Sequence, residues 1–209
     1  MAFEDLLKGI IEFQHLKHEP HAKLFKALSK GQAPDSLMIA CSDSRLVPNF
    51  LTDSGPGDLF ITRNAGNFVP ANQPGAITPA EATLAALEYG VLALNVRHII
   101  VCGHSDCGAM KALLNGAPDT LPAVSAWLKH GDEALKESSN ELCALTQKNI
   151  EVQIRHLRSH PYIAEREGKG ALSLHGWFYD IATGDILALE PHSGAFIPAR
   201  EFYRDQIPQ

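Results

Sequence analysis

The sequence lacks an unbroken apolar run long enough to cross a membrane. Its most apolar long stretch, 77–94, is interrupted by Glu81 and Glu88, and it falls short of the roughly 20 apolar residues that a membrane helix needs. A secretory signal is also missing, because Glu4 and Asp5 stand where such a signal has a basic start. We therefore expect a cytoplasmic protein with no membrane partner.

Clusters of basic residues are missing too. The 209 residues include 18 Lys and Arg against 24 Asp and Glu, which gives a formal net charge of −6. No part of the chain is basic enough to neutralise the phosphates of a nucleic acid, so we expect no nucleic-acid partner. The hydrophobic fraction of 45% and the charged fraction of 20% are close to the averages for globular domains, which excludes disordered and fibrous classes.

Cysteine is scarce as well. The four cysteines stand at 41, 102, 107 and 143, and in a reducing cytosol they are expected to be free thiols or metal ligands rather than disulfides. The Gly-x-Gly-x-x-Gly turn of dinucleotide-binding folds does not follow the first apolar run. A nucleotide-binding protein is therefore the least favoured of the functions considered.

The length of the chain suits one domain over residues 1–209. We divide it into an N-terminal helical arm over 1–30 and an α/β core over 31–209. Within 3–16, apolar residues recur at spacings of three and four, which predicts an amphipathic helix. That helix docks either on its own core or on a second subunit, and the sequence leaves both alternatives open.

Three short apolar runs, 37–40, 59–62 and 98–102, are bounded by Gly, Pro or Asp, as buried parallel strands usually are. Near the C-terminus, 171–180 and 186–190 read as two strands joined by a hairpin turn. The predicted fold class is therefore α/β: a mostly parallel central sheet flanked by helices, with an antiparallel edge hairpin and the N-terminal arm.

Two helices of the core are clearly signalled. Thr78 is a suitable N-cap, with Pro79 at the first helical position and Glu81 three residues after the cap, and the helix should run to about Leu94. A second helix is predicted over 141–158, where apolar residues mostly keep helical spacing.

Two polar clusters follow the first and third apolar runs. Cys-Ser-Asp-Ser-Arg occupies 41–45 and Gly-His-Ser-Asp-Cys occupies 103–107. Ligands of open α/β sheets bind beyond the carboxyl ends of parallel strands, so Cys41, His104 and Cys107 could converge on one ion. Two thiolates and one imidazole suit Zn²⁺, and three protein ligands leave the fourth position of a catalytic site open. The alternative is a buried histidine beside inert cysteines.

Three motifs resemble those of the β-class carbonic anhydrases in order and spacing. They are the segment at 41–45, Arg-Asn-Ala-Gly-Asn at 63–67 and Gly-His-Ser-Asp-Cys-Gly-Ala-Met at 103–110. The likeness extends over nearly the whole chain. The sequence is similar to bacterial members of the plant-like, open-site type, including those associated with cyanate use. Met38 stands where the bicarbonate-inhibited subgroup has Trp, so a non-catalytic bicarbonate site is not expected.

The resemblance implies Zn²⁺ bound by Cys41, His104 and Cys107. A water or hydroxide would be the fourth ligand and would attack CO2 to give bicarbonate. A protein of this kind is a zinc lyase with CO2 and bicarbonate as its small-molecule partners. A relative that hydrolyses CS2 or COS at the same metal, and a non-catalytic zinc or bicarbonate sensor, are the alternative functions.

The resemblance also implies roles around the metal. Asp43 would accept a hydrogen bond beside it, with Arg45 holding the carboxylate; in a closed state Asp43 itself would bind zinc. Gln32, Phe60 and Tyr89 would line a CO2 pocket that lies across a subunit interface. The smallest functional unit is therefore a homodimer, alone or as part of a tetramer or octamer.

Four residues outside the implied ligand set are interpreted as structural. Cys102 and Cys143 match no ligand position and are interpreted as small core residues. Ser105 and Asp106 could merely cap the start of the following helix. Ten histidines are present, and nothing in the sequence chooses a proton shuttle among them.

Overall fold

The computed structural model describes residues 2–73 and 82–207. The chain divides into two compact units, Met1–Ala33 and Pro34–Gln209. The predicted helix start at Thr78–Glu81 lies outside the described residues. Its continuation is helical as predicted, in α4 (Ala82–Glu88) and the π-helical turn η3 (Tyr89–Ala93).

The first unit is helical from Phe3 to Leu28, and the helix that the apolar spacing of 3–16 predicts is confirmed. Its elements are α1 (Phe3–Phe13), the π turn η1 (Gln14–His18), the 3₁₀ turn η2 (Glu19–His21) and α2 (Ala22–Leu28). Pro20 falls in the first turn of η2. At that position a backbone N–H would have no partner within the helix, so proline costs no hydrogen bond there. The polar stretch around it therefore changes the helical hydrogen-bond pattern instead of ending it.

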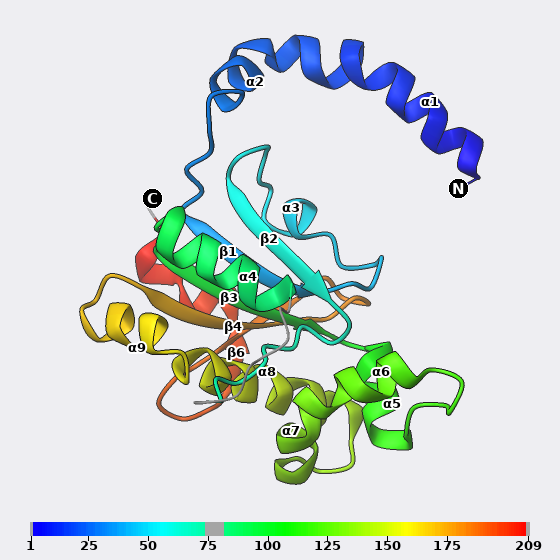
Figure 1. Ribbon diagram of the computed structural model, residues 1–209, viewed down its shortest axis with the longest axis vertical. Helices are drawn as coiled ribbons and strands as arrows, with labels where there is room; N and C mark the ends of the chain where they lie inside the picture. The colour runs from blue at the N-terminus through cyan, green and yellow to red at the C-terminus, as the bar shows by residue number, and fades with distance from the viewer. Residues whose placement is uncertain (1, 74–81, 208–209) are drawn as a thin grey trace. The chain divides into compact units, whose positions relative to one another are not determined.

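The second unit is built on a six-stranded sheet in the order β2-β1-β3-β4-β5-β6 (Figure 1). The strands are β1 (Ser36–Cys41), β2 (Leu59–Asn64), β3 (His98–His104), β4 (Ser173–Tyr179), β5 (Ile186–Leu189) and β6 (Phe196–Pro198). The first four run parallel to one another, and β5 and β6 are antiparallel additions. The predicted fold class is confirmed, including the antiparallel pairing of β4 with β5; β6 was not anticipated.

Both faces of the central strands are covered. Leu37 and Ile39 belong to a core cluster on one face, shared with residues of α4, α8 (Leu142–Arg158) and α9 (Pro161–Gly168). Met38 and Ala40 point to the opposite face, where they pack with residues near α3 (Pro48–Leu51). Coverage on both sides explains why these strands read as continuous apolar runs. The edge strand β2 is only partly buried, unlike the buried strand expected there.

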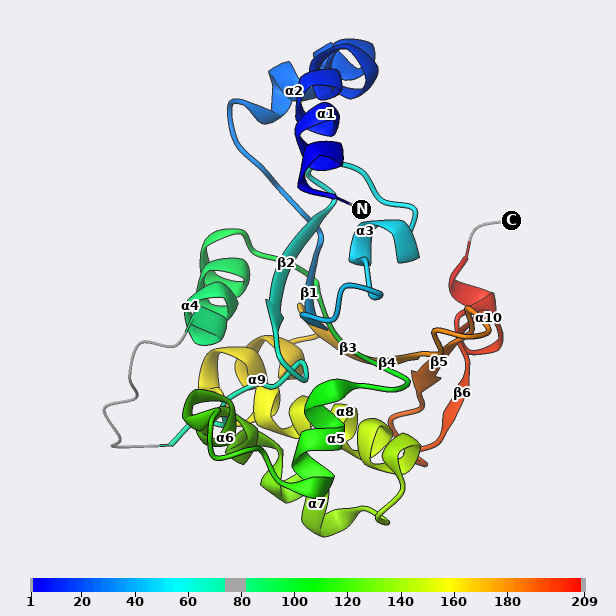
Figure 2. The same cartoon turned by 90° about the vertical axis from the view of Figure 1, so that its right-hand side faces the viewer.

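The remaining helical elements lie between β3 and α8 or after β6. They are α5 (Gly108–Asn115), α6 (Pro122–Leu128), η4 (Lys129–Gly131), α7 (Asp132–Glu137), α10 (Ala199–Phe202) and η5 (Arg204–Gln206). The helix predicted over 141–158 is confirmed as α8. Figure 2 shows α5, α7 and α8 gathered at one end of the sheet. Within the described residues, none of the helices combines the length and apolarity of a membrane span.

Two strand glycines bring α8 close to the sheet. A Cβ on Gly103 would lie 3.0 Å from Cδ1 of Ile150, and one on Gly176 would lie 2.8 Å from Cγ2 of the same residue. Larger side chains in β3 and β4 would therefore push the helix outward. This close approach carries the middle of α8 to the carboxyl end of β3.

Candidate metal centre

Three side chains that could bind a metal meet at the carboxyl ends of β1 and β3. Cys41 ends β1 and His104 ends β3, which is the neighbouring parallel strand. Cys107 is the residue from which α5 begins. Their ligand atoms all lie within 4.8 Å of one another, and all three residues are buried. The structure thus brings together the three ligands named from the sequence.

The imidazole of His104 is turned with one nitrogen toward the thiols. Its Nδ1 donates to the carbonyl oxygen of Ser105 at 2.8 Å, which leaves Nε2 as the acceptor nitrogen. Nε2 is fully buried and has no hydrogen-bond partner. Buried polar atoms are nearly always paired, so this nitrogen fits a cation held jointly with the two sulfur atoms.

The sulfur atoms of Cys41 and Cys107 share one proton through a hydrogen bond. Their Sγ atoms are 3.8 Å apart, and the hydrogen bond from Cys107 lowers the pKa of Cys41 to about 4. The pKa of Cys107 is raised because its proton serves that bond and because it is buried. Backbone N–H groups of Asp43 and Gly66 also donate to the Cys41 sulfur. A divalent cation would displace the shared proton, since thiolates are the metal-binding form.

Asp43 and Arg45 form a bidentate ion pair beside the ligands. Arg45 donates from Nε to Oδ1 at 2.9 Å and from a terminal nitrogen to Oδ2 at 2.7 Å, and these bonds hold the pKa of Asp43 well below its usual range. The Arg45 backbone N–H also donates to Oδ1 at 3.0 Å. Asp43 therefore caps its own turn and also binds the guanidinium. Its Oδ2 lies 3.8 Å from Nε2 of His104.

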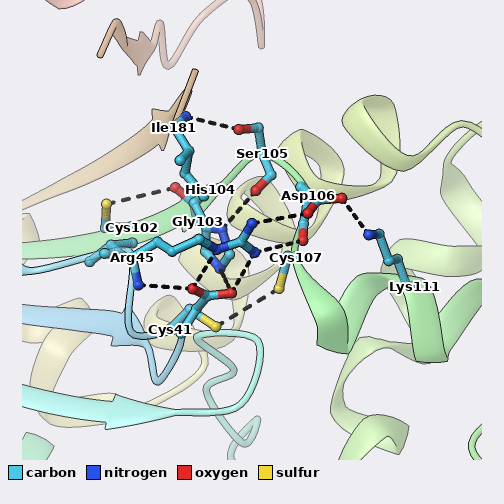
Figure 3. A network of polar contacts seen from close by, with 12 residues as sticks. Cys41, Arg45, Cys102, Gly103, His104, Ser105, Asp106, Cys107, Lys111 and Ile181 are labelled. Atoms are coloured by element: carbon cyan, nitrogen blue, oxygen red, sulfur yellow. Dashed lines mark hydrogen bonds and ion pairs between the residues drawn. The ribbon is translucent and has the colours of Figure 1, made fainter. Parts of the chain in front are cut away.

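A second carboxylate completes the hold on Arg45. Asp106 accepts from the guanidinium at 3.0 Å and also pairs with Lys111, and Figure 3 shows Arg45 reaching toward this turn. Asp106 has a φ of 58°, a left-handed conformation that Asp tolerates better than most residues. Neither Asp106 nor Ser105 caps α5 with its side chain. The Asp106 carboxylate pairs with Arg45 and Lys111, and Ser105 Oγ accepts from the N–H of Ile181.

Arg63 fixes the loop that carries Asp43. Its guanidinium donates to the carbonyl oxygens of Cys41, Asp43 and Leu46 at distances between 2.8 and 3.0 Å. Reasoning from the sequence placed Arg63 only within a motif and gave it no role. Its effect is to lock the backbone on both sides of the Asp43 side chain.

Phe60 and Tyr89, which were expected to line a CO2 pocket, are not beside the metal ligands of the same chain. Phe60 and Tyr89 contact each other, with ring centroids 5.8 Å apart. Asn64 pairs with Cys41 across the sheet, and Phe60 precedes it by four positions, or roughly 13 Å along the strand. Gln32 belongs to the first unit and is exposed. Their assignment to the pocket remains a prediction.

The other two cysteines differ from each other. Cys102 is fully buried, and burial raises the pKa of its thiol to about 12, as expected for an inert core residue. Cys143 is exposed, so its interpretation as a core residue was wrong. It occupies the first turn of α8 on the side away from the core, where the apolar stripe of the helix does not extend.

Comparison with known proteins settles the family. The family model described as carbonic anhydrase matches residues 36–186. The carbonic anhydrase of Pseudomonas aeruginosa is 45% identical over 208 residues, covering 94% of this chain and 92% of that one. The solved β-carbonic anhydrase CcaA has a TM-score of 0.85 at 40% identity, covering 93% of this chain and 98% of that one. The chain belongs to the β-class carbonic anhydrases.

Other β-class carbonic anhydrases agree. Carbonic anhydrase 1 of Escherichia coli O157:H7 is 38% identical over 93% of this chain and 91% of its own. A tetrameric β-carbonic anhydrase from Sordaria macrospora has a TM-score of 0.74 at 31% identity, covering 93% and 98% of the two chains. The prediction of a carbonic anhydrase, an enzyme that reversibly hydrates carbon dioxide to bicarbonate, is confirmed.

Proposed function

We propose that this carbonic anhydrase works with a zinc ion bound by Sγ of Cys41, Nε2 of His104 and Sγ of Cys107. The observation that carries the proposal is the buried Nε2 of His104, which has no partner and faces two thiols. Two thiolates and one imidazole match the preference of zinc, and three protein ligands leave one position for a reactant. When bound, zinc supplies the Lewis acidity that makes water a nucleophile at neutral pH.

In the proposed mechanism, Asp43 orients the attacking water. Its carboxylate is held ionised by Arg45, so it can accept a hydrogen bond but cannot donate one. Oδ2 is the oxygen nearest to the ligand nitrogen of His104, and it is placed to accept a hydrogen bond from the water and so direct a lone pair of the water oxygen toward CO2. If Arg45 released the carboxylate, Asp43 could close the site by binding the metal itself.

The proposal assigns Gln32, Phe60 and Tyr89 to the CO2 pocket of a neighbouring subunit. Within one chain, Phe60 lies far along β2 from the ligand end, and Tyr89 is 50% exposed. Carbon dioxide carries no net charge, so an apolar cleft with one amide donor suits it. A homodimer is then the smallest active unit, and a tetramer or octamer would be assembled from such dimers. The tetrameric fungal relative supports an oligomer.

A cytoplasmic location is part of the same proposal. The metal centre needs two reduced thiols 3.8 Å apart, and a reducing compartment keeps such thiols from forming a disulfide. Measuring the metal content of protein isolated under reducing and oxidising conditions would show whether the site depends on this.

Stopped-flow CO2 hydration with a pH indicator tests the proposed function. The measurement compares protein loaded with stoichiometric zinc, protein stripped by a chelator, and stripped protein reloaded with zinc. We expect rapid hydration that is lost on stripping and regained on reloading. Slow hydration by the zinc-loaded protein, with hydrolysis of COS or CS2 in the same assay, would instead assign it to the alternative substrates.

A further inference from the structure

One face of α8 carries buried polar side chains. Asn149 and Gln153 are fully buried, and His160, just after the helix, is 5% exposed. Each of them binds the backbone of the segment that follows β2, between Gly66 and Pro70. Buried amides cost free energy unless they are paired, so this arrangement holds that segment in one conformation.

The orientation of the Asn149 amide is fixed by its neighbour. Gln153 Oε1 accepts from the N–H of Val69 at 2.7 Å, which leaves Nε2 of Gln153 to donate to Oδ1 of Asn149 at 2.9 Å. The Asn149 Nδ2 group must then point the other way. It donates to the carbonyl oxygen of Gly66 at 3.0 Å.

A second donor holds the preceding peptide from the other side. Trp127 Nε1 donates to the carbonyl oxygen of Ala65 at 2.8 Å. That carbonyl and the N–H of Gly66 belong to one peptide group. Because a peptide is planar, fixing its oxygen also fixes the direction of its N–H. This N–H donates to the sulfur of Cys41.

Gly66 is the residue that this geometry demands. Its φ is +85°, and a Cβ would lie 2.7 Å from the ring of Phe68 and 3.0 Å from Cβ of Ala109. A side chain is therefore excluded both by the backbone conformation and by the space available. The loop can keep this conformation only with glycine here.

We propose that Asn149 and Trp127 are positioning residues of the metal centre, which hold the Gly66 peptide so that its N–H donates to the Cys41 thiolate. The inference rests on the metal site of the proposed function. An N–H donor stabilises the negative charge of a thiolate, which is the form that binds a metal, so loss of the donor should weaken metal binding. Partners of this kind, one shell beyond the ligands, commonly change metal affinity by about 10- to 100-fold.

Two substitutions remove the donors while changing little else. Asn149→Asp keeps the shape of the side chain and the acceptor for Gln153 but replaces the amide donor to Gly66. Trp127→Phe removes the indole N–H and retains an aromatic ring against Phe68, so it keeps the test open if the buried Asp impairs folding. Ile154→Ala is the matched control, because Ile154 is a buried residue of the same helix that belongs to the core over the sheet.

The measurements are the zinc dissociation constant, by competition with a chromophoric chelator, and the thiolate-to-metal absorption of the cobalt-loaded protein. We expect each donor variant to bind zinc about 10- to 100-fold more weakly and to shift the cobalt absorption band. The control should lose thermal stability but keep both metal readouts. A band shift is the readout that a purely structural role would not give.

The possible failures are distinct. If the wild-type protein bound no zinc, the proposed function would fall and this inference with it. If the wild type bound zinc and both donor variants matched its affinity and its spectrum, the inference alone would be wrong. Equal weakening in Ile154→Ala would overturn it too, because the effect would then follow from lost stability.

Discussion

The two ends of β3 carry the same kind of side chain in opposite situations. His98 begins the strand and His104 ends it. At the amino end, Nδ1 of His98 lies 3.1 Å from Nε2 of His175, whose Nδ1 lies 3.1 Å from the hydroxyl of Tyr203. Trp177 donates to the same hydroxyl at 2.9 Å. At the carboxyl end, Nε2 of His104 is buried without any partner.

This difference shows which histidine is built for a ligand. The two imidazoles at the amino end are only partly buried, whereas His104 is fully buried. At the amino end, His175 is fully engaged by its neighbours, and burial beside His98 lowers its pKa to about 4. That histidine is a neutral structural residue. Of the three histidines at the two ends of β3, only His104 has a buried nitrogen without a hydrogen-bond partner, and it lies beside two sulfur atoms.

The largest effect should come from removing a ligand at the carboxyl end. Cys41→Ala should abolish stoichiometric zinc binding and reduce CO2 hydration to background, because two ligands hold the ion poorly. Zinc content after dialysis and stopped-flow turnover measure this. Cys102→Ala is the control, since Cys102 is buried one strand away and is no ligand. Full zinc content in Cys41→Ala would refute the ligand set.

A smaller effect is expected from the residues beside the ligands. Asp43→Asn and Arg45→Ala should each lower turnover by about 100-fold, in the range seen when such partners are removed, while zinc stays bound. Asp43→Asn keeps the size of the side chain and removes its charge. Activity and metal content are measured on the same preparation. Unchanged turnover in both variants would remove the proposed role of the pair.

At the amino end, the expected effect concerns stability and its pH dependence. The folded-state pKa of His175, about 4, lies below the ordinary histidine pKa of 6.5, so the unfolded chain binds more protons between these values. Stability should therefore fall as the pH drops through this window, by about 2 kcal/mol between about pH 7 and about pH 5. The contribution is fully present above the unfolded-state pKa.

Urea unfolding of the wild type and of His175→Gln at the two pH values measures this contribution. Glutamine can still hydrogen-bond but does not titrate, so the pH dependence should be weaker in the variant by the same amount. Zinc also responds to pH, but it affects both proteins alike and cancels in the difference. Identical pH dependence in the two proteins would show that His175 is not the source.

The smallest effect is expected at Asp106. Its partners Arg45 and Lys111 are about as exposed as Asp106 itself, and exposed ion pairs contribute little. Asp106→Asn keeps a residue that tolerates the left-handed backbone, and Arg45 still has both bonds to Asp43. Turnover should fall far less than in Asp43→Asn. A loss of turnover as large as that in Asp43→Asn would show that Asp106 is as important for turnover as Asp43.

Much of this could be predicted from the sequence. Buried parallel strands leave continuous apolar runs, and their carboxyl ends mark where ligands gather, so Cys41, His104 and Cys107 could be named in advance. The three-residue strand β6 was missed because it is too short to show a period. Cys143 was misplaced because a thiol is small enough for either side of a helix.

The support of the site could not be predicted. Asn149 and Gln153 look like solvent-facing residues in the pattern of α8, and only the folded chain shows that loop backbone lies against them. Trp127 reads as an ordinary helix residue for the same reason. Hydrogen bonds to backbone atoms leave little trace in sequence, because many different residues can be the backbone partner.

The distance in sequence between the ligands has a consequence for folding rates. Cys41 and Cys107 are 66 positions apart and meet only after β1 and β3 have paired in parallel, a slow step for any chain. The complete site therefore does not exist early in folding. We expect the metal to leave the refolding rate nearly unchanged and to slow unfolding, which lengthens the lifetime of the native state.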